Sequence, residues 1–384
     1  MQKKHSTSVG SLLGSRLLRF GALAGLAAAL AGPLASCRSE DPSPDLIQPT
    51  GTKPSYALDI NDQMQAVIEQ FMAFNDPALP TLTARQARMT HSVTDAVNAL
   101  LAKNNKVPST PAVTVSQRVL TPAYTPGSAT DGVPVRIYTP TAAATGTLPA
   151  IVYYHGGGWV IGSLMVYEPS AKALAANTGA IVISVDYRLA SETMNKFPAA
   201  HEDAYAAYKW VRDNAATLNI NPAKIAVAGE SAGGNMAAAV CILARERGVT
   251  LPVHELLVYP VADNNLNTTS YMTYANAVPL SKANIVYFTG LYFNTPADGD
   301  NRLISLVDVA DLKGLPTTTI IGAEIDPLQT EGMSLRDKLT AAGVSVDYTL
   351  YPGTTHEFFG TYDVVPPAAT AQSHAADRLK AAFQ

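Results

Sequence analysis

A serine lies at the centre of a glycine-flanked turn between an apolar run and a run of small residues. The apolar run at 225–228 predicts a strand, Gly229-Glu230-Ser231-Ala232-Gly233 predicts a tight turn, and the small residues at 234–238 open a helix. Such a turn strains the backbone of the serine, and glycines two residues before and after it avoid steric clashes. A serine exposed at the start of a helix can attack a carbonyl if a base and an oxyanion site lie nearby. An ordinary glycine-rich turn is the alternative, so other segments must decide between the two interpretations.

The first such segment is a run of glycines after a second apolar stretch. Residues 150–154 predict a strand, and His155-Gly156-Gly157-Gly158-Trp159 follows it directly. Successive glycines leave backbone N–H groups unshielded, and such donors stabilise an oxyanion that develops in a transition state. A flexible loop or a phosphate-binding loop is the alternative. A phosphate-binding loop has a Lys-Ser or Lys-Thr pair after its glycines, and none is present here, so the pattern favours an oxyanion hole.

An acid and a base follow two later strands. Asp326 comes after the strand predicted at 317–321, and His356 comes after the strand predicted at 345–351. Because the carboxyl ends of parallel strands share one edge of a sheet, we expect both side chains to reach the serine. The chain order Ser231, Asp326, His356 is one of the orders in which nucleophile, acid and base occur. These three residues form the predicted catalytic triad.

Other ionisable residues leave alternatives open. Glu324, two residues before Asp326, is an alternative acid, whereas Asp186 ends a strand that precedes the serine, which is the wrong order. His201 begins a predicted helix and is expected to cap it or to pair at the surface. No role for Glu230 follows from the sequence. The remaining histidines are expected to be surface or hydrogen-bonded structural residues: His91, His155, His254 and His374.

The composition argues against several other classes of protein. The chain has neither a His-Glu-x-x-His motif nor a cysteine cluster, and no Gly-x-Gly-x-x-Gly fingerprint follows a predicted strand. We therefore expect no metal and no cofactor. Residues 1–36 hold four of the 27 basic and none of the 31 acidic residues, so the remainder has a formal charge of −8. This acidity argues against a nucleic-acid partner. Cys241 is expected to be a buried free thiol.

The first 36 residues have the pattern of an export signal. Basic residues precede an apolar stretch at 20–31 that is too short to span a bilayer. Leu34-Ala35-Ser36-Cys37 then resembles the lipobox of bacterial lipoproteins, which is cleaved before a lipidated cysteine. We predict a lipoprotein signal peptide at 1–36, lipidation of Cys37 and a flexible tether at 37–57. The protein is then anchored in the bacterial cell envelope, facing the periplasm or in the outer membrane; an ordinary secretory signal and a soluble secreted protein are the alternative.

The alternation of strands and helices predicts one α/β domain over residues 58–384. Helical periodicity recurs at 83–101, and residues 113–120 and 133–138 predict two antiparallel edge strands. From residue 151 onward strands alternate with helices. This alternation indicates a mostly parallel sheet with helices on both faces.

Together these motifs resemble those of the bacterial hormone-sensitive-lipase-like esterases, family IV of the bacterial lipolytic enzymes within the α/β-hydrolases. The resemblance extends from about residue 58 to the C-terminus. It rests on the segments around Ser231, Asp326 and His356 and on the glycine run 155–159. The segment His356-Glu357-Phe358 departs from the usual His-Gly-Phe. This departure bears on the shape of the loop and removes no catalytic group.

The resemblance implies an α/β-hydrolase fold with a helical cap. In this family pattern Gly157, Gly158 and the Ala232 backbone N–H form the oxyanion hole, and residues 58–105 form the cap together with part of 263–305. The residues themselves give a separate expectation for 263–305, which is rich in aromatic side chains. This insertion is expected to form a lid over the site, with the packing of a surface helix as the alternative.

The expected function is that of a serine carboxylic ester hydrolase acting through an acyl-enzyme, and the resemblance implies short acyl chains. An acyltransferase or a deacetylase of a sugar or secondary metabolite uses the same acyl-enzyme and remains an alternative. A non-catalytic ligand receptor on this fold is disfavoured because nucleophile, acid and base are all present. The expected partner is a small-molecule ester, with membrane contact through the lipid anchor. The oligomeric state is left open.

Overall fold

The computed structural model describes residues 46–120, 132–142 and 146–384. Its contacts divide the chain after Pro44, and the larger unit, residues 45–384, contains all the described residues. The predicted signal peptide at 1–36, the predicted lipidation site Cys37 and the first part of the predicted tether lie outside the described residues. No helix in the described ranges is long and apolar enough to cross a membrane.

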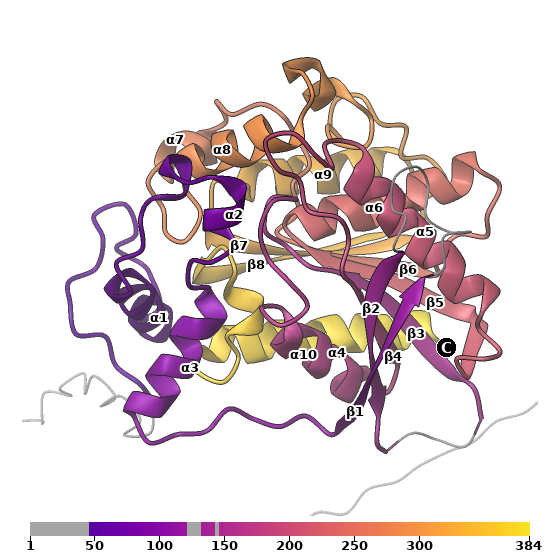
Figure 1. Ribbon diagram of the computed structural model, residues 1–384, viewed down its shortest axis with the longest axis horizontal. Coiled ribbons are helices and arrows are strands. Elements are labelled where there is room, and N and C mark those ends of the chain that lie inside the picture. Colours follow the sequence, from indigo (N-terminus) through magenta and orange to yellow (C-terminus); the bar gives the residue numbers. More distant parts are fainter. Residues whose placement is uncertain (1–45, 121–131, 143–145) are drawn as a thin grey trace, which may run out of the picture. The chain divides into compact units, whose positions relative to one another are not determined.

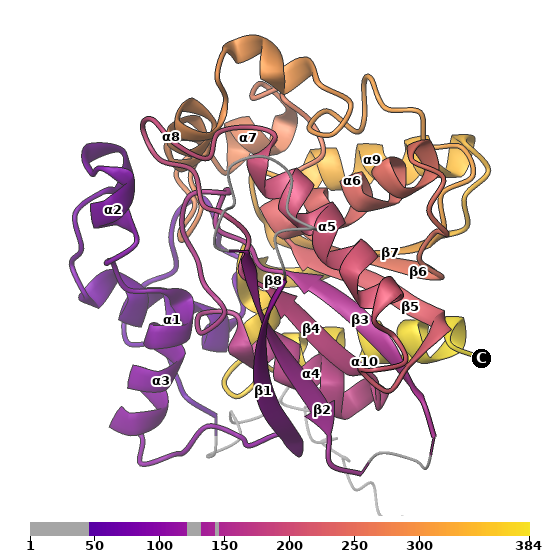
Figure 2. The same cartoon turned by 45° about the vertical axis from the view of Figure 1, so that its right-hand side comes forward.

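An eight-stranded sheet forms the centre of the larger unit (Figure 1), in the order β1-β2-β4-β3-β5-β6-β7-β8. β1 pairs antiparallel with β2, and β2 pairs antiparallel with β4. All the other neighbours in the sheet are parallel. The predicted α/β fold is confirmed, and so are the two antiparallel strands at one edge (Figure 2). The strands are β1 (Val113–Leu120), β2 (Val133–Pro140), β3 (Leu148–Tyr154), β4 (Ile181–Val185), β5 (Ile220–Glu230), β6 (His254–Val258), β7 (Thr317–Ile325) and β8 (Val346–Thr355).

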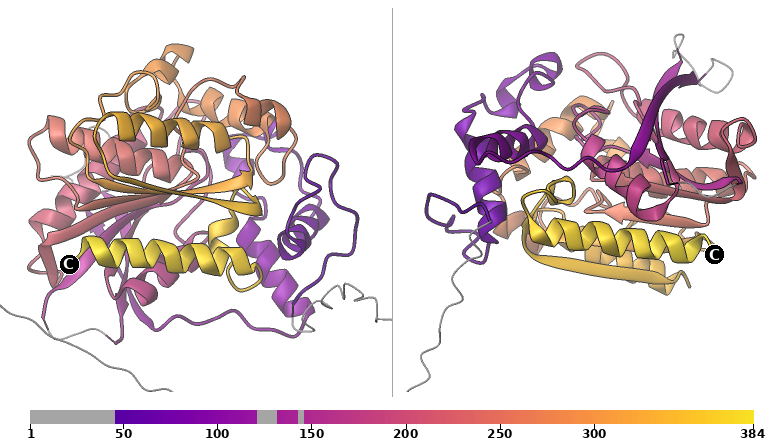
Figure 3. Two further views of the ribbon diagram at one scale, coloured as in Figure 1. Left: turned by 180° about the vertical axis from the view of Figure 1, so that it is seen from behind. Right: turned by 90° about the horizontal axis from the view of Figure 1, so that it is seen from below.

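Helices cover both faces of this sheet (Figure 3). On one face lie α5 (Ala199–Asp213), α6 (Ala232–Glu246) and α9 (Gln329–Ala341). On the other face lie α4 (Glu168–Thr178) and α10 (Pro366–Ala382). The two layers of apolar side chains, one on each side of the sheet, bury every residue of β4 and β6.

The apolar runs of the central strands explain this arrangement. Successive side chains of a strand point to opposite faces of the sheet. Val152 and Val227 therefore join the core under α5 and α6, whereas Ile151 and Ala226 join the core over α4 and α10. An apolar run within a strand is stable only when both faces of the strand are covered, and residues 150–154 of β3 and 225–228 of β5 form such runs.

Short helices precede the sheet and interrupt its later part. They are α1 (Asp62–Ala73), η1 (Leu79–Thr81), α2 (Ala84–Ala87), α3 (Val93–Lys103), α7 (Thr269–Thr273), α8 (Lys282–Tyr292), η3 (Pro296–Asp300) and η4 (Phe358–Gly360). The prediction of one helical stretch over 83–101 was wrong, because the chain forms α2 and then α3. The side chain of Ser92 accepts a hydrogen bond from the Asp95 N–H at 3.2 Å, and the Asp95 carboxylate accepts one from the Ser92 N–H at 2.7 Å. This reciprocal pair caps the N-terminus of α3 and starts a new helix there.

Candidate active site

Ser231 lies in the turn between β5 and α6, with a backbone φ of 57° and ψ of −119°. This is a strained conformation for a residue with a side chain. A methyl group on Gly229 would lie 2.1 Å from the Gly233 carbonyl oxygen, and one on Gly233 would lie 2.0 Å from the Tyr154 carbonyl oxygen. Both contacts are impossible, so the turn requires glycine on each side of the serine. The sharp turn directs the Ser231 hydroxyl into a pocket above the carboxyl ends of the strands.

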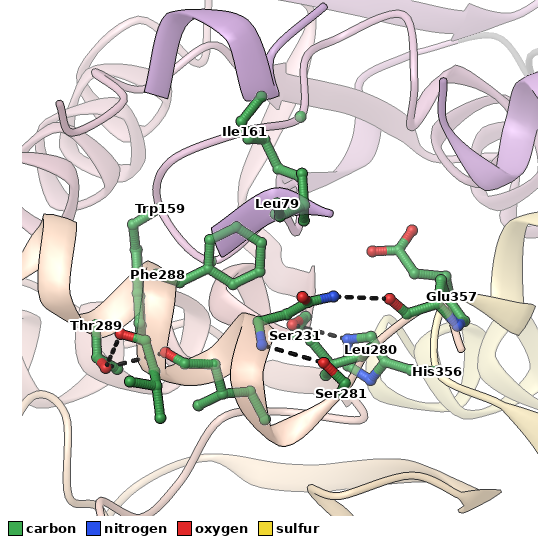
Figure 4. Close-up of a pocket in the computed structure, with 18 of the residues that line it drawn as sticks. Leu79, Trp159, Ile161, Ser231, Leu280, Ser281, Phe288, Thr289, His356 and Glu357 are labelled. Carbon is green, nitrogen blue, oxygen red and sulfur yellow. Dashed lines mark hydrogen bonds between the residues drawn. The ribbon is translucent and has the colours of Figure 1, made fainter. Parts of the chain in front are cut away.

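The structure brings Ser231, His356 and Asp326 into one hydrogen-bonded series. The His356 Nε2 atom lies 2.9 Å from the Ser231 Oγ, and the His356 Nδ1 atom lies 2.7 Å from the Asp326 Oδ2. The second carboxylate oxygen of Asp326 accepts the Leu328 N–H at 2.9 Å, which fixes the orientation of the carboxylate. All three side chains are buried. Figure 4 shows Ser231 and His356 together at the wall of the pocket.

The surroundings of His356 favour its charged form. Burial alone lowers the pKa of an imidazole, but the adjacent Asp326 carboxylate and its hydrogen bond outweigh that effect, so the pKa of His356 lies above the ordinary value of 6.5. A histidine held in this way accepts a proton from the serine and is stabilised as an imidazolium while it carries that proton. The alternative acid, Glu324, has a different partner: its Oε2 accepts the Gly353 N–H at 2.7 Å.

The glycine run lies beside Ser231 and lines the same pocket. Gly157 has a φ of 104° and Gly158 a φ of 59°, values that favour glycine. A methyl group on Gly157 would lie 2.3 Å from the Ile161 carbonyl oxygen. Within the described chain, neither the Gly157 nor the Gly158 N–H donates to a protein acceptor. Ala232 is the first residue of α6, so its N–H also has no acceptor within the helix.

The position of His201 differs from the sequence prediction. His201 was expected to cap a helix or to pair at the surface, but it is fully buried inside the first turn of α5. Its Nδ1 lies 2.7 Å from the Tyr292 hydroxyl, and its Nε2 lies 2.9 Å from the Asn235 Oδ1. Burial lowers the pKa of His201 to about 4, so the ring is neutral at ordinary pH. This histidine therefore connects α5 to α6 and α8 beneath the site.

The other histidines are hydrogen-bonded, as predicted. His254 is buried between Thr317 and Thr319, at 2.8 and 3.0 Å from their hydroxyl oxygens. The ring of His155 is buried under the glycine run, where its Nδ1 lies 2.8 Å from the Gly156 carbonyl oxygen. His91 pairs with Asp76 and His374 with Asp347.

Sequence reasoning missed the role of Glu230. This buried carboxylate accepts hydrogen bonds from the Tyr153 hydroxyl and, at 2.5 Å, from the Tyr259 hydroxyl. Burial raises its pKa to about 7. The Tyr259 ring packs on the His356 ring, with centroids 4.5 Å apart. Glu230 therefore fixes a tyrosine that supports the histidine. The available signal was the position of two tyrosines at the ends of β3 and β6, next to the strand that carries Glu230.

A cavity of about 1040 Å³ opens above Ser231. Its walls come from segments far apart in the sequence, and Leu79, Ile161, Leu280 and Phe288 provide apolar surface (Figure 4). Residues from 58–105 and from 263–305 both line it. Among the described residues, no group of three or more His, Cys, Asp or Glu side chains could hold a metal ion. The cavity is of the size that holds small organic ligands.

Comparison with known proteins agrees with this geometry. Residues 151–360 match the family model described as the alpha/beta hydrolase fold. The chain belongs to this family. Within the α/β-hydrolases it is a hormone-sensitive-lipase-like member, and its enzyme class is that of the carboxylesterases, which are serine hydrolases.

Two curated relatives and one solved structure illustrate this α/β-hydrolase similarity. Carboxylesterase NlhH of Mycobacterium tuberculosis is 41% identical over 254 residues, which cover 65% of this chain and 79% of that protein. Ethyl acetate hydrolase of Pseudomonas putida is 34% identical over 240 residues, which cover 61% of this chain and 74% of the relative. The crystal structure of a thermostable esterase from Pseudomonas putida ECU1011 superposes with a TM-score of 0.76 at 28% identity, and it covers 86% of this chain and 99% of that one.

Proposed function

We propose that the chain hydrolyses carboxylic esters through an acyl-enzyme on Ser231. The observation that carries this proposal is the continuous series of hydrogen bonds from the Ser231 Oγ to His356 at 2.9 Å and from His356 to Asp326 at 2.7 Å. Such a series lets a weakly acidic hydroxyl lose its proton at the moment it attacks. It requires no cofactor for the bond changes that follow.

In the first half of the reaction, the Ser231 Oγ adds to the ester carbonyl carbon while its proton passes to His356 Nε2. The N–H groups of Gly157, Gly158 and Ala232 bind the oxyanion of the tetrahedral intermediate, and one such donor is worth about 3–4 kcal/mol. Collapse of this intermediate breaks the bond to the alcohol oxygen. The alcohol leaves with the proton from His356, and the acyl group stays on Ser231.

In the second half, water takes the place of the alcohol. It gives one proton to His356 as its oxygen attacks the acyl carbon, and the second tetrahedral intermediate releases the carboxylic acid and restores the serine. Asp326 keeps the imidazole in the required orientation throughout and stabilises its charged form.

The acyl group in this proposal is short. A methyl group on Gly158 would lie 2.3 Å from the Phe288 ring, so this ring lies directly against the loop that binds the oxyanion. The ring limits the space next to the carbonyl carbon. A relative of this chain is named ethyl acetate hydrolase, which also favours a short acyl group. In the same proposal, residues 58–105 and part of 263–305 act as a cap that excludes water from the cavity.

A chain-length series tests this assignment. We expect kcat/KM for p-nitrophenyl acetate and butyrate to exceed that for the laurate by roughly tenfold or more. The additional methylene groups of the long acyl chain do not fit beside the Phe288 ring, and this misfit weakens binding of the transition state. The measurement uses the purified domain with every ester in true solution. The substitution Phe288→Ala is the matched control, and it should reduce the preference for the short esters. A value for the laurate equal to that for the acetate would contradict the short-chain assignment.

We also propose that residues 1–36 are a lipoprotein signal peptide, that Cys37 carries a lipid and that 37–57 is a tether. The support is the sequence pattern of basic residues, a short apolar stretch and Leu34-Ala35-Ser36-Cys37. A lipid anchor of this kind would hold the enzyme in the cell envelope without a membrane-spanning helix.

The substitution Cys37→Ser should move most of the ester-hydrolysing activity from the membrane fraction to the soluble fraction of a bacterial host. It should also abolish the incorporation of labelled palmitate, because the thiol that accepts the lipid is gone. The buried cysteine supplies a matched control: Cys241→Ala should keep both the palmitate label and the membrane association. Continued labelling of the Cys37→Ser protein would disprove the proposed anchor.

A further inference from the structure

Glu357, the residue after His356, has a backbone conformation that does not suit it. Its φ is 67° and its ψ is 12°, in the left-handed region that glycine adopts without strain. Strained residues of this kind cluster at functional sites, where a side chain is needed in spite of the backbone. Glu357 is only partly buried, and it lines the same pocket as Ser231 and His356. Figure 4 shows its carboxylate at the His356 side of the pocket.

One oxygen of this carboxylate is occupied and the other is available. The Tyr167 hydroxyl donates a hydrogen bond to Glu357 Oε1, which orients the carboxylate. No group in the described part of the chain donates to Glu357 Oε2. This oxygen is also not among the buried polar atoms that lack a partner. It can therefore accept a hydrogen bond from a molecule in the pocket or form an ion pair with a positively charged group on that molecule.

Among the described residues, no lysine or arginine contributes to the electrostatic surroundings of Glu357. Burial raises its pKa, His356 and the Tyr167 hydroxyl oppose that effect, and Asp326 adds to it. Glu230 lies close enough to interact with it as well. Two other basic side chains that line the cavity have partners elsewhere. Arg88 donates from its Nε to the Val160 carbonyl oxygen at 2.8 Å, and His91 pairs with Asp76. In the described part of the chain, His356 is therefore the one protein cation that a positively charged ligand would meet at this carboxylate.

The chemistry of the reaction identifies which part of a substrate reaches Glu357. Because His356 returns its proton to the departing alcohol oxygen, the alcohol part of the ester lies on the His356 side of Ser231. Glu357 directly follows His356 and lines this side. We propose that Glu357 is a specificity-determining residue that binds a cationic group on the alcohol part of the ester, so that the enzyme favours esters of amino alcohols. This proposal rests on the proposed ester hydrolysis.

A pair of isosteric esters tests the proposal. Acetylcholine and neohexyl acetate have the same shape, but acetylcholine has a quaternary nitrogen where neohexyl acetate has a quaternary carbon. The ratio of their kcat/KM values therefore measures the effect of the positive charge alone. We expect Glu357→Gln to lower the ratio of acetylcholine to neohexyl acetate by about tenfold or more, the effect of losing one charge-assisted contact. Glu357→Asp should keep part of the preference. Choline and neohexyl alcohol, used as inhibitors of p-nitrophenyl acetate hydrolysis, should show the same change in relative affinity.

Two further variants make the result decisive. Glu357→Gly suits a φ of 67°, so it keeps the fold while removing the carboxylate, and it should lose the cationic preference as fully as Glu357→Gln. Asp76→Asn removes another carboxylate from the lining, one already paired with His91, and should leave the ratio unchanged. If the ratio of kcat/KM for acetylcholine to that for neohexyl acetate stayed unchanged in Glu357→Gln and in Glu357→Gly, the role of Glu357 would be overturned while ester hydrolysis stands. A wild-type protein that hydrolyses no ester would overturn both proposals.

Discussion

Replacing Ser231 by alanine lowers kcat for p-nitrophenyl acetate by about a millionfold, the loss typical of a triad without its nucleophile. The reason is that, among the residues the structure describes, Ser231 supplies the hydroxyl that lies 2.9 Å from His356 Nε2, and no other hydroxyl contacts this atom. Residual turnover then depends on water and the oxyanion-binding groups alone. The decisive measurement combines steady-state kinetics with mass spectrometry after treatment with a fluorophosphonate. The wild-type protein gains one covalent label on Ser231, and the Ser231→Ala protein gains none.

The control for this experiment is a serine outside the pocket. Ser334 lies on α9, and its Oγ donates to the Thr330 carbonyl oxygen at 3.0 Å. Ser334→Ala should keep the wild-type kcat and the covalent label. Both variants should unfold cooperatively at a temperature near that of the wild type, because neither substitution opens a large cavity. A folded Ser231→Ala protein with a turnover within tenfold of the wild type would remove Ser231 from the mechanism.

Much of this site could be predicted because its geometry is local. A strand that leads into a helix through Gly-x-Ser-x-Gly has one sterically feasible turn, and the contacts at Gly229 and Gly233 show why. The approach of Asp326 and His356 to the serine follows from a general property of parallel sheets, in which the carboxyl ends of the strands share one edge. No knowledge of the side-chain packing was needed for either step.

The features that could not be predicted depend on packing between distant segments. His201 was expected to cap a helix or to pair at the surface because it begins a predicted helix, yet Tyr292 and Asn235, far away in the sequence, hydrogen-bond to its buried ring. The pairing of Glu230 with Tyr153 and Tyr259 joins the ends of three strands and has no local signature. The strain at Glu357 is likewise a property of the folded turn.

The break in the predicted helix at 83–101 has a different cause. The capping residue Ser92 with Asp95 three positions later is a local signal of a new helix. Helical periodicity continues across this signal, so the periodicity alone favoured one helix.

Replacing Asp326 by asparagine should lower kcat by about ten-thousandfold, because an amide fails to hold the histidine in the tautomer and orientation that the reaction needs. The same substitution should also move the acid limb of the pH profile. In the wild type only neutral His356 accepts the serine proton, and its pKa lies above 6.5, so kcat/KM falls as the pH drops through a value above 6.5. Without the carboxylate, burial becomes the dominant influence on His356. Burial lowers the pKa of an imidazole, so the limb should move to a lower pH than in the wild type.

Glu324→Gln is the matched control for this prediction, because it removes a carboxylate two residues away that accepts the Gly353 N–H at 2.7 Å. It should leave the acid limb of kcat/KM at the wild-type position and keep most of the turnover. The pair of variants therefore separates the carboxylate that touches the imidazole from a general loss of negative charge at this edge of the sheet. If Glu324→Gln moved the limb and Asp326→Asn did not, the acid would be Glu324, and the hydrogen bond of 2.7 Å between His356 and Asp326 would have no part in the reaction.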